Sequence, residues 1–230
     1  MKKFLVFSLW VSLIFARAVS LNKTQKDVST MTEILWNFDN LEAVGGNSIT
    51  VLGAPRVIDT PNGKATEFDG KQDGLLVNGL PLTGFDQFTV EVIFRPDADG
   101  LKEQRFFHMQ ESASQNRVLL ETRLTGNSRW FLDTYIRSDQ TDQTLFAENF
   151  THPVGQWYQA ALVFDGREMR HYVNGTEELA SEISFVPLHQ GQTSIGVRIN
   201  RVYWFKGAIR KARFSPRALM PEKFLQPSYE

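Results

Sequence analysis

The sequence has 230 residues, of which 42% are apolar and 12% aromatic, and its formal net charge is −1. This composition predicts a packed core rather than intrinsic disorder, and the lack of a basic surplus argues against a nucleic-acid-binding protein. The chain contains no cysteine, which excludes disulfides, thiolate metal sites and cysteine nucleophiles.

The N-terminal residues predict export. Two lysines follow Met1, an apolar run covers residues 4–15, and Ala16-Arg17-Ala18 has the small-x-small pattern of a cleavage site. The run is shorter than the roughly 20 residues that a membrane span needs. We therefore expect a signal peptide over residues 1–18, a secreted or periplasmic protein, and no stable membrane anchor after cleavage. Residues 19–30 are polar and aperiodic, and they predict a linker.

The remaining residues, 31–230, predict one domain built from short strands. In chain order, the expected strands cover residues 34–38, 56–58, 66–68, 75–77, 88–94, 105–109, 118–124, 130–136, 157–164, 169–173, 193–196 and 203–214. Asp165-Gly166 and Asn174-Gly175 close the two ends of a hairpin, because both pairs tolerate positive φ. Ser215 and Pro216 predict a single helical turn after the last strand. Many short strands without a long helical period indicate a β-sandwich or a barrel.

Four sequence motifs resemble those of a known fold family. They are the residues 65–70 (Ala-Thr-Glu-Phe-Asp-Gly), 88–92, 155–157 together with 172–175, and 205–209 ahead of 215–219. In order and spacing they are similar to the concanavalin A-like lectin/glucanase superfamily, and within it to the laminin G-like jelly-roll domains of secreted bacterial proteins, over about residues 31–225. The resemblance implies an all-β fold, an antiparallel two-sheet β-sandwich of jelly-roll type. Because this superfamily includes lectins, adhesion modules and glycosidases, it does not imply one activity.

The resemblance also implies a structural calcium site at an acidic pair in the last strand. Here Gly207-Ala208-Ile209 is followed by Arg210 and Lys211. Calcium prefers anionic oxygen ligands, which neither side chain offers. We therefore expect no cofactor, and Asp39 remains as one oxygen donor if calcium does bind.

Alternation places charged and aromatic side chains together on two middle strands. Glu121 and Arg123 share one face, and Asp133, Tyr135 and Arg137 share a face of the next strand. Rings can pack on sugar C–H faces while ions bind hydroxyl groups, which indicates a sugar-binding surface. A solvated sheet face with cross-strand ion pairs is the alternative. A histidine lies on a neighbouring strand, and two tryptophans lie at strand starts, near loops, where exposed rings often mark recognition sites. The candidate ligand-binding residues are therefore His108, Glu121, Arg123, Trp130, Asp133, Tyr135, Arg137 and Trp204.

No catalytic motif stands out. The glucanases of the superfamily carry Glu-x-Asp-x-x-Glu, but Glu67-Phe68-Asp69 is followed by Lys71 and Gln72, so the second glutamate is missing. The histidines lack zinc-site spacing. We therefore predict a secreted, non-catalytic module that binds a glycan or an extracellular protein surface. Two alternatives stay open: a glycoside hydrolase or lyase with a dispersed site that needs Glu121, and a structural or adhesive envelope protein.

Overall fold

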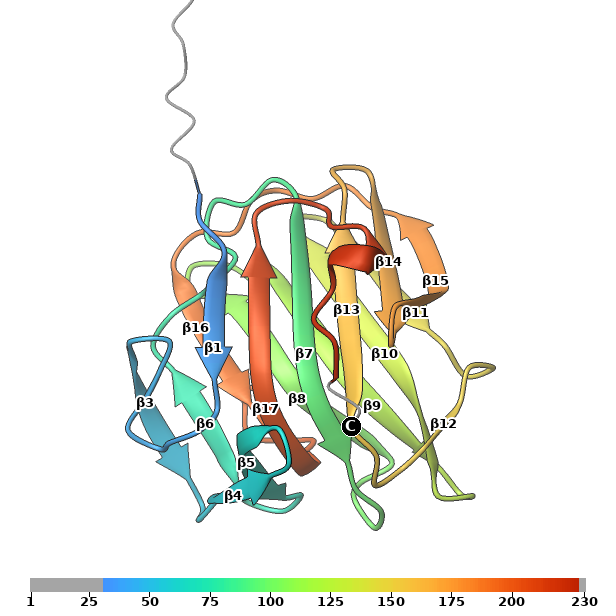
Figure 1. The fold of residues 1–230 in the computed structure, drawn as a ribbon. Coiled ribbons are helices and arrows are strands. Elements are labelled where there is room, and N and C mark those ends of the chain that lie inside the picture. The colour runs from blue at the N-terminus through green and yellow to red at the C-terminus, as the bar shows by residue number, and fades with distance from the viewer. Residues whose placement is uncertain (1–30, 228–230) are drawn as a thin grey trace, which may run out of the picture. The chain divides into compact units, whose positions relative to one another are not determined.

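The computed structural model describes residues 31–227 (Figure 1). The predicted signal peptide and linker, residues 1–18 and 19–30, lie outside the described residues. Among the described residues, 32–227 form one compact unit. In the part of the chain that the structure describes, no helix has the length and apolar character that crossing a membrane requires.

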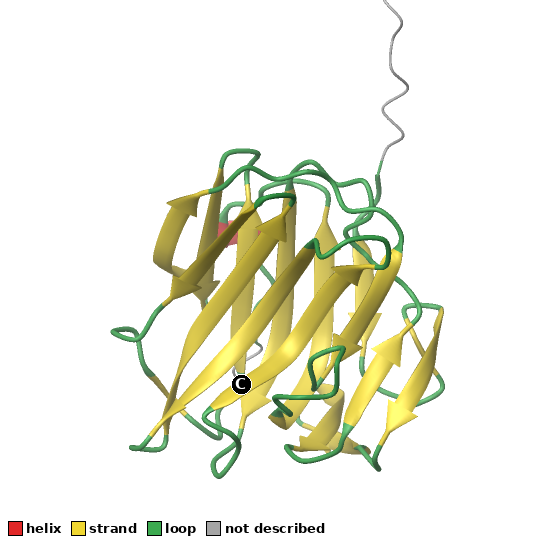
Figure 2. Ribbon diagram, turned by 180° about the vertical axis from the view of Figure 1, so that it is seen from behind, coloured by secondary structure: helices red, strands yellow, loops and turns green. Residues whose placement is uncertain are grey.

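The described strands form two antiparallel sheets that pack face to face (Figures 1 and 2). One, the β7 sheet, contains β1 (Ile34–Asn37), β4 (Arg56–Thr60), β5 (Gly63–Asp69), β7 (Phe88–Pro96), β13 (Tyr158–Phe164), β14 (Glu168–Val173), β15 (Thr176–Glu182) and β17 (Lys206–Ser215). The other, the β9 sheet, contains β2 (Ala43–Val44), β3 (Asn47–Leu52), β6 (Gly74–Val77), β8 (Glu103–Glu111), β9 (Arg117–Thr125), β10 (Arg129–Ser138), β11 (Thr141–Phe146), β12 (His152–Pro153) and β16 (Gly191–Ile195). This arrangement confirms the predicted antiparallel two-sheet β-sandwich.

The strand order in each sheet mixes near and distant parts of the chain. The β7 sheet runs β15-β14-β13-β7-β17-β5-β4, with β1 also paired to β17. The β9 sheet runs β11-β10-β9-β8-β16-β6-β3-β2, with β12 also paired to β10. Strands β8 to β11 are consecutive in both sequence and space, so this part of the β9 sheet is built from simple hairpin connections.

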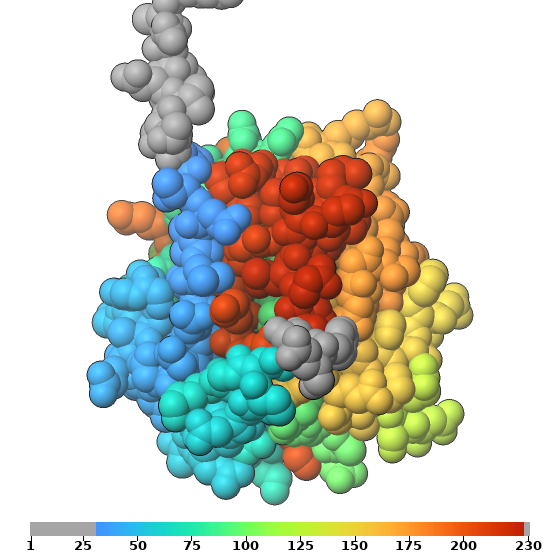
Figure 3. All heavy atoms as spheres, in the orientation of Figure 1, coloured from blue at the N-terminus to red at the C-terminus, as the bar shows by residue number. Residues whose placement is uncertain are grey.

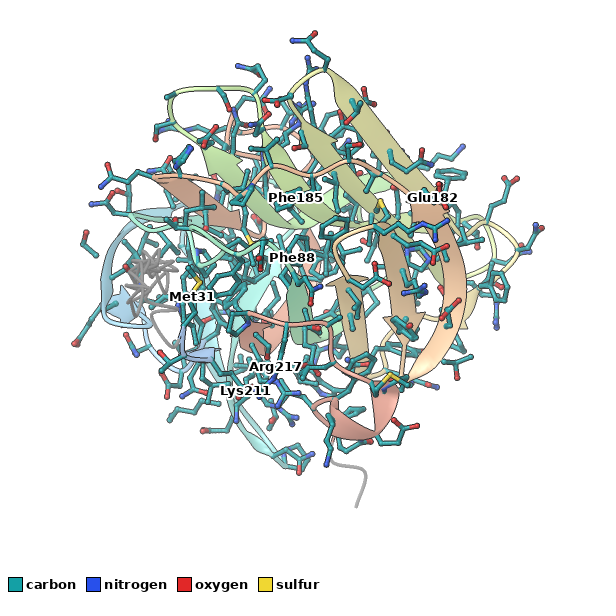
Figure 4. All side chains as sticks on the ribbon, turned by 90° about the horizontal axis from the view of Figure 1, so that it is seen from above. Met31, Phe88, Glu182, Phe185, Lys211 and Arg217 are labelled. Carbon is teal, nitrogen blue, oxygen red and sulfur yellow. The ribbon has the colours of Figure 1, made fainter. Side chains whose placement is uncertain are left out.

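Aromatic side chains fill the layer between the sheets. Phe94 on β7 and Phe106 on β8 stack with ring centroids 4.4 Å apart and an interplanar angle of 6°. Phe88 meets Phe185 edge-on at 5.3 Å, and Figure 4 shows both inside the sandwich when it is viewed from above. Every one of these rings except Phe185 is fully buried. Large flat rings of this kind contribute strongly to the burial that stabilises a cysteine-free sandwich.

The predicted hairpin is confirmed, whereas the predicted helical turn is wrong. Gly166, Asn174 and Gly175 have φ values of +98°, +50° and +78° in the turns at the two ends of β14. Ser215, expected to cap a helical turn over residues 215–219, still belongs to β17, and its hydroxyl donates to the Glu33 carboxylate at 3.0 Å. The helical turn that the structure describes here is the 3₁₀ turn η1 (Pro221–Lys223).

The C-terminal segment covers part of the outer face of the β7 sheet. Phe224 packs edge-on against Tyr172 at 5.2 Å and belongs to a small apolar cluster with Ala161 and Val163. The backbone N–H of Leu225 donates to the buried Glu91 carboxylate at 2.6 Å. In the space-filling view, this segment lies across the middle of the face (Figure 3). The outer face of the β9 sheet is turned toward the viewer in Figure 2. It carries most of the candidate binding residues, but not Trp130, whose side chain lies in the core.

Candidate functional site

Two carboxyl groups lie side by side on the outer face of the β9 sheet. Glu121 on β9 and Asp133 on β10 are direct cross-strand partners, and their exposed fractions are only 3% and 1%. Arg123 Nη2 lies 2.7 Å from Asp133 Oδ2 and 3.4 Å from Glu121 Oε2. Arg105 Nε lies 2.9 Å from Glu121 Oε1, and both arginines also pair with Glu103. We call these five residues the acid–arginine network.

Two of the three carboxyl groups of this network, those of Glu121 and Asp133, are costly to ionise. Burial, reinforced by the negative charge of Asp133, raises the pKa of Glu121 to about 7. Burial also raises the pKa of Asp133, although the neighbouring Arg123 opposes this shift. Near neutral pH Glu121 is therefore only partly ionised, and Arg105 and Arg123 lie within reach of its charge.

Aromatic rings border the network around a shallow hollow. The Arg105 guanidinium lies 3.9 Å from the centroid of the Tyr203 ring, which is 36% exposed. Arg117 Nη2 donates to the Tyr135 hydroxyl at 3.3 Å. The hollow has a volume of about 190 Å³ and is lined by Arg105, Arg117, Leu119, Glu121, Arg123, Asp133, Tyr135, Thr144 and Arg198.

The loop over residues 196–205 forms one wall of this site, and His108 anchors it. His108 is 1% exposed; its Nδ1 accepts a hydrogen bond from the Ile199 backbone N–H at 3.2 Å, and its Nε2 lies 3.0 Å from Gln110 Oε1. Burial, followed by the charge of Arg198, lowers the pKa of His108 to about 3, so the imidazole is neutral. Tyr203 has φ +60°, a conformation that is rare for a bulky residue and that persists only where the surroundings impose it.

The structure brings together most of the predicted site, but not the tryptophans. Arg137 lies on the same face, opposite Arg117 in the register. The prediction that Trp130 lies exposed at a rim is wrong, because its side chain is fully buried in the core, 5.2 Å from Phe94. Trp204 is half-buried beside Gly74 of β6, away from the described residues that line the hollow.

The sequence reasoning missed several residues of the site. Arg117 has the same alternation as Glu121 and could have been found by that signal. Arg105 could not have been found by alternation, because a β-bulge between Arg105 and Phe107 changes which side chains of β8 face outward. Arg198 and Tyr203 come from the loop over residues 196–205, which no periodic pattern places.

The implied calcium position holds a cation instead of carboxylates. The Arg210 guanidinium lies 5.6 Å from the centroid of the Trp157 ring. Asp39 follows Phe38, whose backbone N–H donates to the Arg210 carbonyl at 3.0 Å. The Asp39 side chain is exposed, and its Oδ1 accepts a hydrogen bond from Asn40 Nδ2 at 2.8 Å. Within residues 31–227, no group of three or more His, Asp or Glu side chains is arranged to hold a metal ion. The residues present thus do not fit the family's calcium site, and the expectation that no cofactor is needed stays a prediction.

Comparison with known proteins places this sandwich in a family. The model of a family described as the concanavalin A-like lectin/glucanases superfamily (Laminin_G_3) matches residues 69–223. The chain belongs to this superfamily. No curated protein sequence matches the chain.

Solved structures of the superfamily's fold include several binding domains. Domain 4 of an extracellular arabinanase from Geobacillus stearothermophilus, in complex with arabinotriose, is 21% identical with a TM-score of 0.63, and the match covers 83% of this chain and 94% of that domain. The ligand-binding domain of botulinum neurotoxin serotype D, in complex with N-acetylneuraminic acid, is 15% identical with a TM-score of 0.60, covering 84% of this chain and 49% of that one. A heptameric SAP-like pentraxin from Limulus polyphemus is 18% identical with a TM-score of 0.54, covering 68% and 77%. At these identities the likeness shows the fold alone, and this chain spans about half the length of the botulinum domain.

Proposed function

We propose that this superfamily member is an exported carbohydrate-binding module without catalytic activity, and that it binds a glycan on the outer face of the β9 sheet. The observation that supports this most is the hollow, where guanidinium and carboxyl groups from β8, β9, β10 and the loop over residues 196–205 meet the Tyr135 ring. The Tyr203 ring lies against Arg105, one of the lining residues. Guanidinium and carboxylate groups hydrogen-bond hydroxyls, and rings pack on the apolar faces of sugars.

The rigidity of the site favours recognition over a merely solvated face. Exposed ion pairs on a sheet contribute little and stay mobile, whereas Glu121 and Asp133 are almost fully buried and held by two arginines. A site whose polar groups are fixed before the ligand arrives loses less entropy on binding. Two structural neighbours are named as complexes with arabinotriose and with N-acetylneuraminic acid, which adds support by analogy of fold.

Hydrolysis or lysis of a glycan is the second candidate, and the Glu121–Asp133 pair is the observation that favours it. A pKa of about 7 for Glu121 suits a general acid at neutral pH. Against it, a glycosidase needs two carboxyl groups that flank the glycosidic bond, and here Arg123 contacts both groups while Arg105 contacts Glu121. Incubation with a panel of polysaccharides tests this candidate: release of reducing ends that stops in Glu121→Gln would establish it.

A glycan array followed by calorimetric titration of the best-bound glycan tests the proposed function. Tyr135→Ala removes the half-exposed ring at the hollow and should weaken binding about tenfold. Leu35→Ala is the control, because Leu35 is exposed on β1 of the other sheet, and it should leave the affinity unchanged. An array without any bound glycan would contradict the proposal, and oligomers or a captured extracellular protein would then favour the structural or adhesive role.

A further inference from the structure

Three arginines lie in or beside the hollow, and two of them, Arg117 and Arg198, line it. Arg117 comes from β9, Arg137 lies directly opposite it on β10, and Arg198 comes from the loop over residues 196–205. Burial lowers the pKa of Arg117, Tyr135 and Asp142 oppose this shift, and the positive charges of Arg198 and Arg137 add to it. The three guanidinium groups, called the arginine cluster below, are therefore close enough to repel one another.

The arginine cluster lacks the counter-charges that the acid–arginine network has. Within residues 31–227, no carboxylate oxygen lies within 4.0 Å of a guanidinium nitrogen of the cluster. Asp142 is the direct partner of Arg137 on β11, but its side chain is exposed and forms no such ion pair. The cluster is thus a concentration of positive charge on a chain whose net charge is −1.

The hydrogen bonds of Arg117 leave part of its donor capacity unused. Its Nη1 donates to the Gln115 carbonyl at 2.8 Å and its Nη2 to the Tyr135 hydroxyl at 3.3 Å. Its Nε is buried and has no partner among the described residues. An anionic ligand that approaches this end of the hollow would offset the repulsion among the guanidinium groups, whereas the buried Nε is out of a ligand's reach.

We propose that the glycan bound on this face is acidic, and that its carboxylate or sulfate group binds the arginine cluster while a sugar ring packs on Tyr135. This inference rests on the proposed function, because it names the class of glycan for the same site. A guanidinium group binds a carboxylate or a sulfate through two parallel N–H groups. The Arg117 guanidinium lies over the Tyr135 ring, 5.0 Å from its centroid, so a cationic group and an aromatic ring meet at this end of the hollow and the sugar would pack on the part of the ring that Arg117 leaves uncovered.

The experiment compares charged and neutral polymers with the same backbone. Polygalacturonate is titrated against its fully methyl-esterified form, and dextran sulfate against dextran, at an ionic strength of about 0.15 M, where long-range attraction is largely screened. We expect one of the two acidic polymers to bind at least about tenfold more tightly than its neutral counterpart. The polymer that does so shows whether the arginine cluster prefers a carboxylate or a sulfate group. Arg198→Gln and Arg137→Gln should each lose about tenfold of that affinity. Arg217→Gln, a matched loss of charge at an exposed position on the β7-sheet side of the domain (Figure 4), should lose less than about twofold.

The outcomes separate this inference from the proposed function. Neutral glycans that bind at Tyr135 as tightly as acidic ones would overturn the inference and leave the proposed function standing. Equal losses in Arg198→Gln and Arg217→Gln would overturn it as well, because the attraction would then be unspecific. So would tighter binding of a single-stranded oligonucleotide than of either acidic polymer. Failure of every glycan, neutral or acidic, would instead remove the proposed function itself.

Discussion

Replacing Glu121 by Gln should change how the stability of the domain depends on pH. The pKa of Glu121 is raised from 4.5 to about 7, first by burial and then by the charge of Asp133. A group with a raised folded-state pKa contributes stability that is fully present below its unfolded pKa and is lost as the pH rises through the folded value. The wild-type domain therefore loses stability from this side chain as the pH rises from 4.5 to 7.

The size of this effect follows from the shift. The difference between 4.5 and about 7 corresponds to roughly 3 kcal/mol, most of which falls between pH 5 and pH 8 by linkage. Gln resembles the protonated carboxyl in shape and charge, so the variant does not pay this cost. Relative to the wild type, Glu121→Gln should thus gain roughly 2–3 kcal/mol of unfolding free energy on going from pH 5 to pH 8.

Urea denaturation followed by tryptophan fluorescence at pH 5, 6.5 and 8 measures this difference. Glu148→Gln, at an exposed carboxyl group, serves as the control and should differ from the wild type by a nearly constant amount. A Glu121→Gln difference that does not change with pH, or that changes in the opposite direction, would refute the reasoning about the acid–arginine network.

Three further predictions concern the core. Burial lowers the pKa of His171 to about 3, so its contribution to stability is present above pH 6.5 and falls by about 1.4 kcal/mol per pH unit below it; His171→Gln should flatten the stability profile in urea titrations from pH 7 to pH 4. Phe94→Ala should cost about 3–5 kcal/mol of unfolding free energy because it removes a fully buried ring, and a loss under 1 kcal/mol would contradict the packing described here. Gly196 and Gly175 both have positive φ, but only at Gly196 would an added Cβ lie too close to another side chain, 2.6 Å from the Phe68 ring. Thermal unfolding should therefore show a larger loss of stability for Gly196→Ala than for Gly175→Ala.

The sequence predicted best what the covalent geometry of a strand determines. Side chains alternate between the two faces of a strand, so Asp133 and Tyr135 lie on one face of β10 as expected, next to Glu121 on β9. The same alternation places Trp130 with Leu132 and Ile136 on the inner face, a signal that the prediction of an exposed tryptophan overlooked. Turns at pairs such as Asn174-Gly175 were equally predictable, because few residue types adopt the positive φ that such turns need.

The rest of the site depends on contacts that no local pattern encodes. The bulge in β8 lets both Phe106 and Phe107 face the core and turns Arg105 outward to Glu121. The loop that carries Tyr203 is held by the Arg105 backbone N–H, which donates to the Tyr203 carbonyl at 2.9 Å. The raised pKa of Glu121 likewise arises from burial and a cross-strand neighbour. Each of these features is a product of tertiary packing, so it appears only once the strands are assembled.

The central claim is that a glycan binds on the outer face of the β9 sheet. Backbone amide chemical shifts, recorded while the best-bound glycan of the array is titrated into the protein, test this most directly. The account predicts that the largest shifts fall on β8, β9, β10 and residues 196–205, and that Tyr135→Ala reduces them. Shifts confined to the β7 sheet or to the C-terminal segment around Phe224 would contradict it.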